Sequence, residues 1–148
     1  YEPQTVDVDG LAYREGLNAV SITGGIAGNV IPDECVLEIN YRFAPDKTLE
    51  QAQQHCRELF PGHELEFVDL SPAARPGLDR ASAAAFVAAV GQEPKPKYGW
   101  TDVARFSAMG VPAVNFGPGD ALLAHTDDEH VSAEAIRQCR RVLLSWLS

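Results

Sequence analysis

The sequence is poor in cysteine, and its three cysteines, Cys35, Cys56 and Cys139, stand far apart without a C-x-x-C pair. That count and spacing suit neither a disulfide framework nor a zinc finger, so we expect reduced thiols. The sequence also lacks an apolar run of the ~20 residues that a membrane span needs, and its N-terminus carries no signal-peptide pattern. These absences predict a cytoplasmic protein.

Several catalytic signatures are absent as well. The sequence contains no P-loop, no G-x-G-x-x-G and no G-x-S-x-G, so it offers neither a loop that cradles phosphate nor a serine nucleophile. A formal net charge of −9 disfavours nucleic acid or an anionic membrane as partner. What remains is an ordinary globular composition, with 148 residues and 45% hydrophobic residues, which is enough for a domain with a core.

The first half of the chain predicts a β-β-α-β unit. Residues 17–23 and 35–43 read as two strands paired antiparallel, the second with one buried face because its apolar residues alternate. Thr48 predicts the N-cap of a helix over 48–60, and residues 64–70 alternate as a further strand. This pattern is typical of a ferredoxin-like domain that lacks its first strand and helix.

The second half differs in composition and predicts mostly helix. After a proline-rich linker at 71–77, helices are expected over 79–90, over 101–109 with Thr101 as cap, and over 132–147. A short apolar strand is expected over 111–116. The fold class is therefore α/β, with residues 1–70 and 71–148 as two domains, both incomplete.

Candidate site residues follow the predicted strand 111–116. Gly117 and Gly119 form a glycine-rich loop, and His125 comes next, with Glu129 in the acidic run behind it. Near a strand end, an imidazole flanked by carboxylates suits a metal ligand or a proton carrier. An exposed histidine in a polar loop is the alternative.

Three further residues carry two interpretations each. Arg42 is either a residue on a solvated strand face, or part of a surface ion pair, or a guanidinium fork for a substrate carboxylate. Asn29 is either a left-handed turn residue or a donor to a developing oxyanion. Thr101 is either a helix cap or part of an anion site at a helix N-terminus.

The order of these motifs resembles the zinc aminoacylase/carboxypeptidase family, in the actinobacterial branch that hydrolyses N-succinyl-LL-2,6-diaminopimelate. The resemblance covers nearly the whole chain. In the first half it rests on Asn18-Ala-Val, Gly28-Asn-Val-Ile-Pro-Asp-Glu34 and Asn40-Tyr-Arg-Phe43. In the second half it rests on Tyr98-Gly-Trp-Thr-Asp-Val-Ala-Arg-Phe106, Asn115-Phe-Gly-Pro-Gly119, Ala124-His125 and Asp128-Glu-His-Val131.

The resemblance implies a binuclear amide hydrolase of lysine and diaminopimelate biosynthesis. Two zinc ions would be expected per complete active site, with cobalt or manganese as substitutes, and an N-succinyl amino acid as the small-molecule substrate. Residues 1–70 would be the lid, or dimerisation, domain of a homodimer, and residues 71–148 the C-terminal part of the catalytic domain.

The resemblance also implies a role for each candidate residue. His125 would be a zinc ligand, and Glu129 would support it from the second shell. Asn29 would be a catalytic residue that reaches the partner's site, and Arg42 would clamp a substrate carboxylate, the succinyl one first. The substrate pocket would be lined by Thr101, Gly117 and Gly119.

The sequence departs from that family in one way that matters. The family's remaining zinc ligands have no counterpart here. Its general base comes from a Glu-Glu pair, and this chain contains no such pair. We therefore expect a fragment that is inactive alone. A related N-acyl-amino-acid deacylase or a dipeptidase is the alternative within the family, and a non-catalytic ferredoxin-like dimerisation or ligand-binding module is the alternative outside it.

Overall fold

The computed structural model describes residues 1–148, which form two compact units. Unit 1 comprises Tyr1–Ala73 and Pro96–Trp100, and unit 2 comprises Ala74–Lys95 and Thr101–Ser148. Strands occur only in unit 1 and pair antiparallel, and helices occur in both units. The predicted mixed α/β class is thereby confirmed. No helix is both long and apolar enough to cross a lipid bilayer.

Unit 1 opens with a hairpin that the sequence analysis missed. Strands β1 (Thr5–Val8) and β2 (Leu11–Arg14) pair antiparallel across the two-residue turn Asp9-Gly10. Both turn residues have positive φ, 54° and 78°, as a type I′ turn requires, and Asp-Gly is a favoured pair for that turn. The Asp7 carboxylate accepts a hydrogen bond from the Gly10 amide at 3.2 Å and closes the turn.

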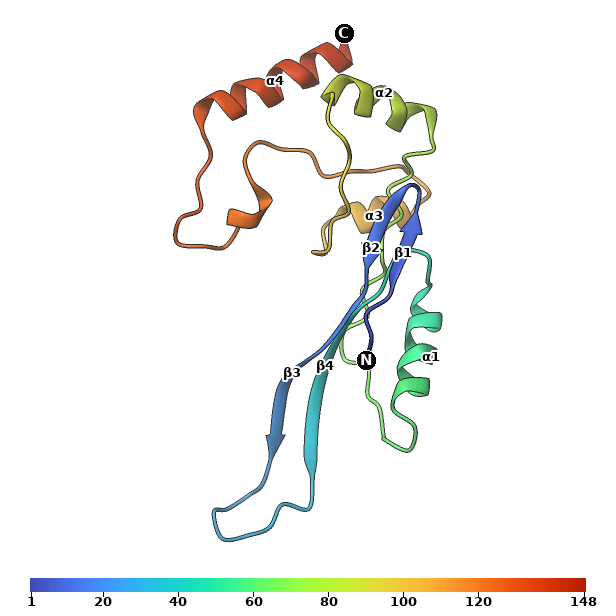
Figure 1. Cartoon of the computed structure of the whole chain (residues 1–148), viewed down its shortest axis with the longest axis vertical. Coiled ribbons are helices and arrows are strands. Elements are labelled where there is room, and N and C mark those ends of the chain that lie inside the picture. Colours follow the sequence, from blue (N-terminus) through green and yellow to red (C-terminus); the bar gives the residue numbers. More distant parts are fainter. The chain divides into compact units, whose positions relative to one another are not determined.

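A long two-stranded ribbon follows directly (Figure 1). Strands β3 (Gly16–Gly24) and β4 (Cys35–Arg42) pair antiparallel, which confirms the pairing predicted from alternation. The register shifts between Ala19 and Ser21, so Val20 stands in a bulge, where a strand bends and twists more strongly. The far part of the ribbon is exposed on both strands, and it ends in the loop 25–34.

Helix α1 (Leu49–Leu59) lies where the sequence predicts a helix, and it starts from the predicted cap. Thr48 Oγ1 accepts a hydrogen bond from the Gln51 amide, and Gln51 Oε1 accepts one from the Thr48 amide, a reciprocal capping box. The strand expected over 64–70 is wrong, because those residues are neither strand nor helix. A strand exists only through a ladder with a neighbour, and no other strand pairs with this segment.

The core of unit 1 lies beside the hairpin. Val8, Leu11 and Tyr13 are buried, as are Ala44 after β4 and Ala52 on α1. The segment 96–100 lies at the edge of this core. The Tyr98 hydroxyl in this segment accepts a hydrogen bond from the Arg14 amide at 3.4 Å.

One charged side chain, Glu15 between β2 and β3, is buried with the core of unit 1. Glu15 Oε1 accepts hydrogen bonds from the Ala44 amide at 2.9 Å and from Lys47 Nζ at 2.8 Å. Glu15 Oε2 accepts one from the Tyr41 hydroxyl at 3.1 Å. A single carboxylate thus ties the start of the ribbon to the chain that leaves β4.

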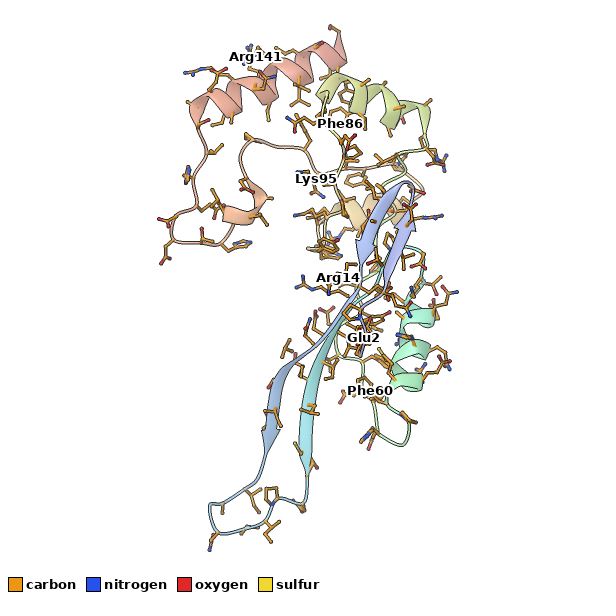
Figure 2. The ribbon with its side chains drawn as sticks, in the orientation of Figure 1. Glu2, Arg14, Phe60, Phe86, Lys95 and Arg141 are labelled. Atoms are coloured by element: carbon orange, nitrogen blue, oxygen red, sulfur yellow. The ribbon has the colours of Figure 1, made fainter.

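Unit 2 is helical. Its elements are α2 (Ala81–Val90), α3 (Val103–Ala108), the 3₁₀ turn η1 (Ala121–Leu123) and α4 (Ala133–Leu147). Aromatic rings join α2 to α4, because the Phe86 ring meets Trp146 edge-on at 4.9 Å and Phe116 at 5.3 Å between centroids (Figure 2). Such edge-to-face pairs add to the gain from burial.

Two expectations for unit 2 are corrected. Residues 111–116 form no strand, since unit 2 offers no neighbouring strand to pair with. Thr101 is not a helix cap, because α3 starts at Val103 with Asp102 as its N-cap residue and without a side-chain cap bond. The expected helices over 79–90 and 132–147 are confirmed within two residues, with Ser132 Oγ capping α4 by accepting from the Ala135 amide.

Candidate functional site

The predicted site residues divide between the two units. Asn29 and Arg42 belong to unit 1, on the loop 25–34 and at the end of β4. Thr101, Gly117, Gly119, His125 and Glu129 belong to unit 2.

His125 stands in a strained backbone conformation. Its φ is +65°, a region that residues other than glycine rarely enter, although histidine enters it more often than most. The His125 amide donates a hydrogen bond to Glu129 Oε2 at 3.0 Å, and the Glu129 amide donates to the Thr126 carbonyl at 3.1 Å. Glu129 therefore holds the backbone of His125, so the structure brings these two predicted residues together. Such strain is typical of functional sites.

Metal chemistry needs more donors than this loop supplies. A zinc site takes three or four protein ligands, and nowhere in the chain do three His, Cys, Asp or Glu side chains gather so as to hold a metal ion. The side chain of His125 is exposed, and Glu129 is engaged with the backbone. The residues present do not form a metal site by themselves.

Thr101 lies near the segment that leads to the glycine loop. Its hydroxyl Oγ1 accepts a hydrogen bond from Asn115 Nδ2 at 3.2 Å, two residues before Gly117. Gly119 has φ +89°, and a Cβ there would lie 3.4 Å from Val131 Cγ2, so this turn favours glycine on conformational grounds. Unit 2 thus brings Thr101 and the start of the glycine loop to one place.

Arg42 is exposed at the end of β4, and no carboxylate of the chain forms an ion pair with it. Its Nε donates to Asn40 Oδ1 at 3.2 Å. The surface ion pair considered for Arg42 is therefore wrong, whereas the solvated strand face is what the structure shows, with the Nη groups exposed. Asn40 belongs to the motif Asn40-Tyr-Arg-Phe43, from which no role was predicted for it. Its place two residues before Arg42, on the same face of the strand, was the available signal.

Asn29 is exposed in the loop 25–34 at the end of the ribbon. The Val30 amide donates to the Ala27 carbonyl at 3.2 Å, which makes a tight turn around Asn29. Asn29 is not among the residues with positive φ, so the expectation of a left-handed turn residue is wrong. Its amide side chain forms no hydrogen bond within the chain.

A model of the peptidase dimerisation domain of the M20 family matches residues 10–67. A protein of Mycobacterium tuberculosis, named provisionally as the succinyl-diaminopimelate desuccinylase DapE, is 53% identical over 99% of this chain and 42% of its own length. The succinyl-diaminopimelate desuccinylase of Corynebacterium glutamicum is 44% identical over 100% of this chain and 42% of its own length. The acetylornithine deacetylase of Myxococcus xanthus is 31% identical over 86% of this chain.

The chain thus spans less than half the length of these curated relatives. Its similarity to them runs through both units, since it covers nearly every residue, whereas the family model covers unit 1 alone. The resemblance found in the motifs is confirmed: the chain belongs to the M20 peptidase family, and residues 10–67 are its dimerisation domain.

Proposed function

We propose that the protein acts in the removal of the succinyl group from N-succinyl-LL-2,6-diaminopimelate by amide hydrolysis. The observation that carries this proposal is the 53% identity over 99% of the chain to a relative named for that activity. A second relative with the same activity in its name is 44% identical over the full chain.

The arrangement of unit 1 supports a role in substrate binding. The guanidinium of Arg42 has no acidic partner and keeps its Nη donors free, and a carboxylate is the ligand that such a fork binds best. N-succinyl-diaminopimelate carries a carboxylate on the succinyl group, so we assign Arg42 to substrate binding. In unit 2, we assign Thr101, Gly117 and Gly119 to the lining of the substrate pocket.

His125 is proposed as one ligand of a zinc centre, held in place by Glu129. The support is its strained, hydrogen-bonded position together with the family membership of the chain. The other ligands would have to come from residues that this chain does not contain, because no group of three donors is present. The proposal includes two zinc ions per complete active site, or cobalt or manganese in their place.

We further propose a homodimer through unit 1. The matching family model is a dimerisation domain, and the outer part of the β3–β4 ribbon exposes apolar side chains that a partner would cover. Asn29 lies in the loop 25–34 at the end of that ribbon, which supports its assignment as a catalytic residue acting in the partner's site.

A deacylase for another N-acyl amino acid is the second candidate. It is favoured by the similarity to the acetylornithine deacetylase of Myxococcus xanthus. The two candidates differ at the acyl group, since succinyl ends in a carboxylate and acetyl does not. The contribution of Arg42 to each substrate therefore distinguishes them.

The test uses the gene product that contains residues 1–148, assayed with added zinc on N-succinyl-LL-2,6-diaminopimelate and on N-acetylornithine. We expect faster hydrolysis of the succinyl substrate. Arg42→Ala should lower its kcat/KM by about tenfold to a hundredfold, the loss expected for a hydrogen bond between charged groups.

Arg14→Ala is the matched control, because Arg14 is an exposed strand arginine of the same unit. It should leave both activities unchanged. An equal loss on both substrates with Arg42→Ala would contradict the succinyl assignment, and an absence of turnover on any N-acyl amino acid would favour a non-catalytic module.

A further inference from the structure

Arg42 and Asn40 lie side by side on one face of β4. Residues two apart in a strand point to the same face, and the Nε of Arg42 donates to the amide oxygen of Asn40 at 3.2 Å. A guanidinium carries five N–H donors. This bond engages the one on Nε and leaves the four on the Nη groups for a ligand.

The opposite strand has a glycine, Gly16, directly across from Arg42. In the antiparallel register Gly16 faces Arg42, and Asn18 faces Asn40, so the four residues share one face of the ribbon. Gly16 has no side chain, and a Cβ built there would meet only Asn18 Nδ2, at 3.7 Å. β3 therefore places no side chain directly opposite Arg42, and the Asn18 side chain borders that position.

The chemistry of residue 40 matters as much as its position. A carboxylate there would pair with the guanidinium and compensate its charge, whereas a neutral amide oxygen orients the guanidinium and leaves its charge for the ligand. An exposed arginine loses side-chain entropy when a ligand fixes it, and a bond that fixes it beforehand reduces that loss.

We propose that Asn40 is a positioning residue for Arg42, which holds the guanidinium so that its Nη groups face a carboxylate of the substrate. The proposal rests on the proposed function, in which Arg42 binds that carboxylate. Asn40 acts through Arg42 alone, so it contributes to binding and not to the chemical step.

The kinetic test compares Asn40→Ala with Asn18→Ala in the same gene product. The two asparagines are opposite each other in the register and both exposed, but only Asn40 bonds to Arg42. Asn40→Ala should raise KM for the succinyl substrate by about threefold to tenfold with kcat unchanged, the size expected for one side chain that is no longer preorganised. Asn18→Ala should leave both constants unchanged.

A double variant tests whether Asn40 acts through Arg42. Adding Asn40→Ala to Arg42→Ala should cause no further loss, because the side chain that Asn40 positions is already gone. Asn40→Asp should weaken binding more than Asn40→Ala, since it adds a competing charge. Additive losses in the double variant, or equal losses from Asn40→Ala and Asn18→Ala, would overturn the proposal.

A second measurement is independent of turnover. In nitrogen-15 NMR spectra of the gene product, the Nε–H signal of Arg42 should shift on titration with succinate, and Asn40→Ala should raise the Kd of succinate by about threefold to tenfold. If the signal does not respond to succinate, the positioning proposal fails. If succinate binds as expected but no N-succinyl substrate is hydrolysed, only the proposed function fails.

Discussion

At the scale of single residues, Glu15 is the buried charged side chain of unit 1. It accepts hydrogen bonds from Ala44, Lys47 and Tyr41. Burying a carboxylate is unfavourable unless donors surround it, and removing Glu15 would leave the Ala44 amide and the Tyr41 hydroxyl without this acceptor. Glu15 therefore joins the hairpin, the ribbon and the approach to α1.

Replacing Glu15 should destabilise unit 1 strongly. We expect Glu15→Ala to lower the free energy of unfolding by about 2–4 kcal/mol, because the buried Ala44 amide and the Tyr41 hydroxyl lose their acceptor and Lys47 keeps only Asp46. Urea unfolding followed by Trp100 fluorescence in a Trp146→Phe background measures this, since Trp100 belongs to unit 1. Glu38→Ala, at an exposed position of β4, is the control and should change little. Equal effects of the two variants would contradict this role.

The Tyr41 hydroxyl gives unit 1 an alkaline limit. Burial raises its pKa far above the usual value of 10.0, and the charge and hydrogen bond of Glu15 raise the pKa further. Because the folded-state pKa lies above the unfolded one, this stabilisation is complete below pH 10 and is lost as pH rises beyond it. We expect the urea midpoint to fall above pH 10, and to fall less steeply in Tyr41→Phe. Parallel decline of both proteins would contradict the assignment.

At the scale of elements, what could be predicted followed local signals. The alternation in β4, the capping box of α1 and the glycine after α2 are each encoded within a few residues, and all three elements formed. The buried face expected for β4 is wrong, because none of its residues is buried. The hairpin β1–β2 was not predicted, although the pair Asp9-Gly10 is typical of a two-residue hairpin turn. Strands over 64–70 and 111–116 were expected wrongly, since strand formation depends on a distant partner that the alternation of one segment does not reveal.

The candidate site shows the same division. The motif order pointed to His125 and Glu129, and the structure joins them by a hydrogen bond. The group of His125 that Glu129 binds was not predictable from the motif. Glu129 accepts its hydrogen bond from the backbone amide of His125 and not from the ring. The role suggested for Asn40 also depends on a rotamer of Arg42, which no spacing specifies.

The β3–β4 ribbon carries the prediction about assembly. Ile22 and Leu37 are opposite each other in the register and 71% and 54% exposed. If a second copy covers them, Leu37→Ser should shift the protein towards monomer, measured by sedimentation velocity over a range of concentrations. Val68→Ser is the control, since Val68 is 77% exposed in unit 1 but lies outside the ribbon. A dimer unaffected by Leu37→Ser, or equally weakened by Val68→Ser, would exclude this interface.

At the scale of the whole molecule, buried apolar side chains are unevenly distributed. Most of them belong to unit 1, whereas unit 2 contributes Pro76 and Ala104, and neither α2 nor α4 has a buried residue. Helices gain most of their stability from burying an apolar face, and Ile136, Leu144 and Leu147 on α4 remain exposed. The two units should therefore differ in stability.

Hydrogen exchange of the isolated chain 1–148 should reveal that difference. We expect amides of β1, β2 and α1 to exchange more slowly than those of α2 and α4, because local opening is easiest where few apolar contacts are lost. Mass spectrometry of peptic fragments measures the exchange. The slowest exchange in α4 would contradict this view.

The close approach at Gly24 has a consequence for protein engineering. A Cβ at this position would lie 2.8 Å from the Glu34 carbonyl oxygen. The two strands therefore approach each other closely at the end of the ribbon, where Gly24 and Cys35 form its last pair. The residues between them leave and re-enter the ribbon at one fixed point. We therefore expect that loops of other lengths and sequences can replace residues 25–34, which include Asn29, without changing the register of the strands.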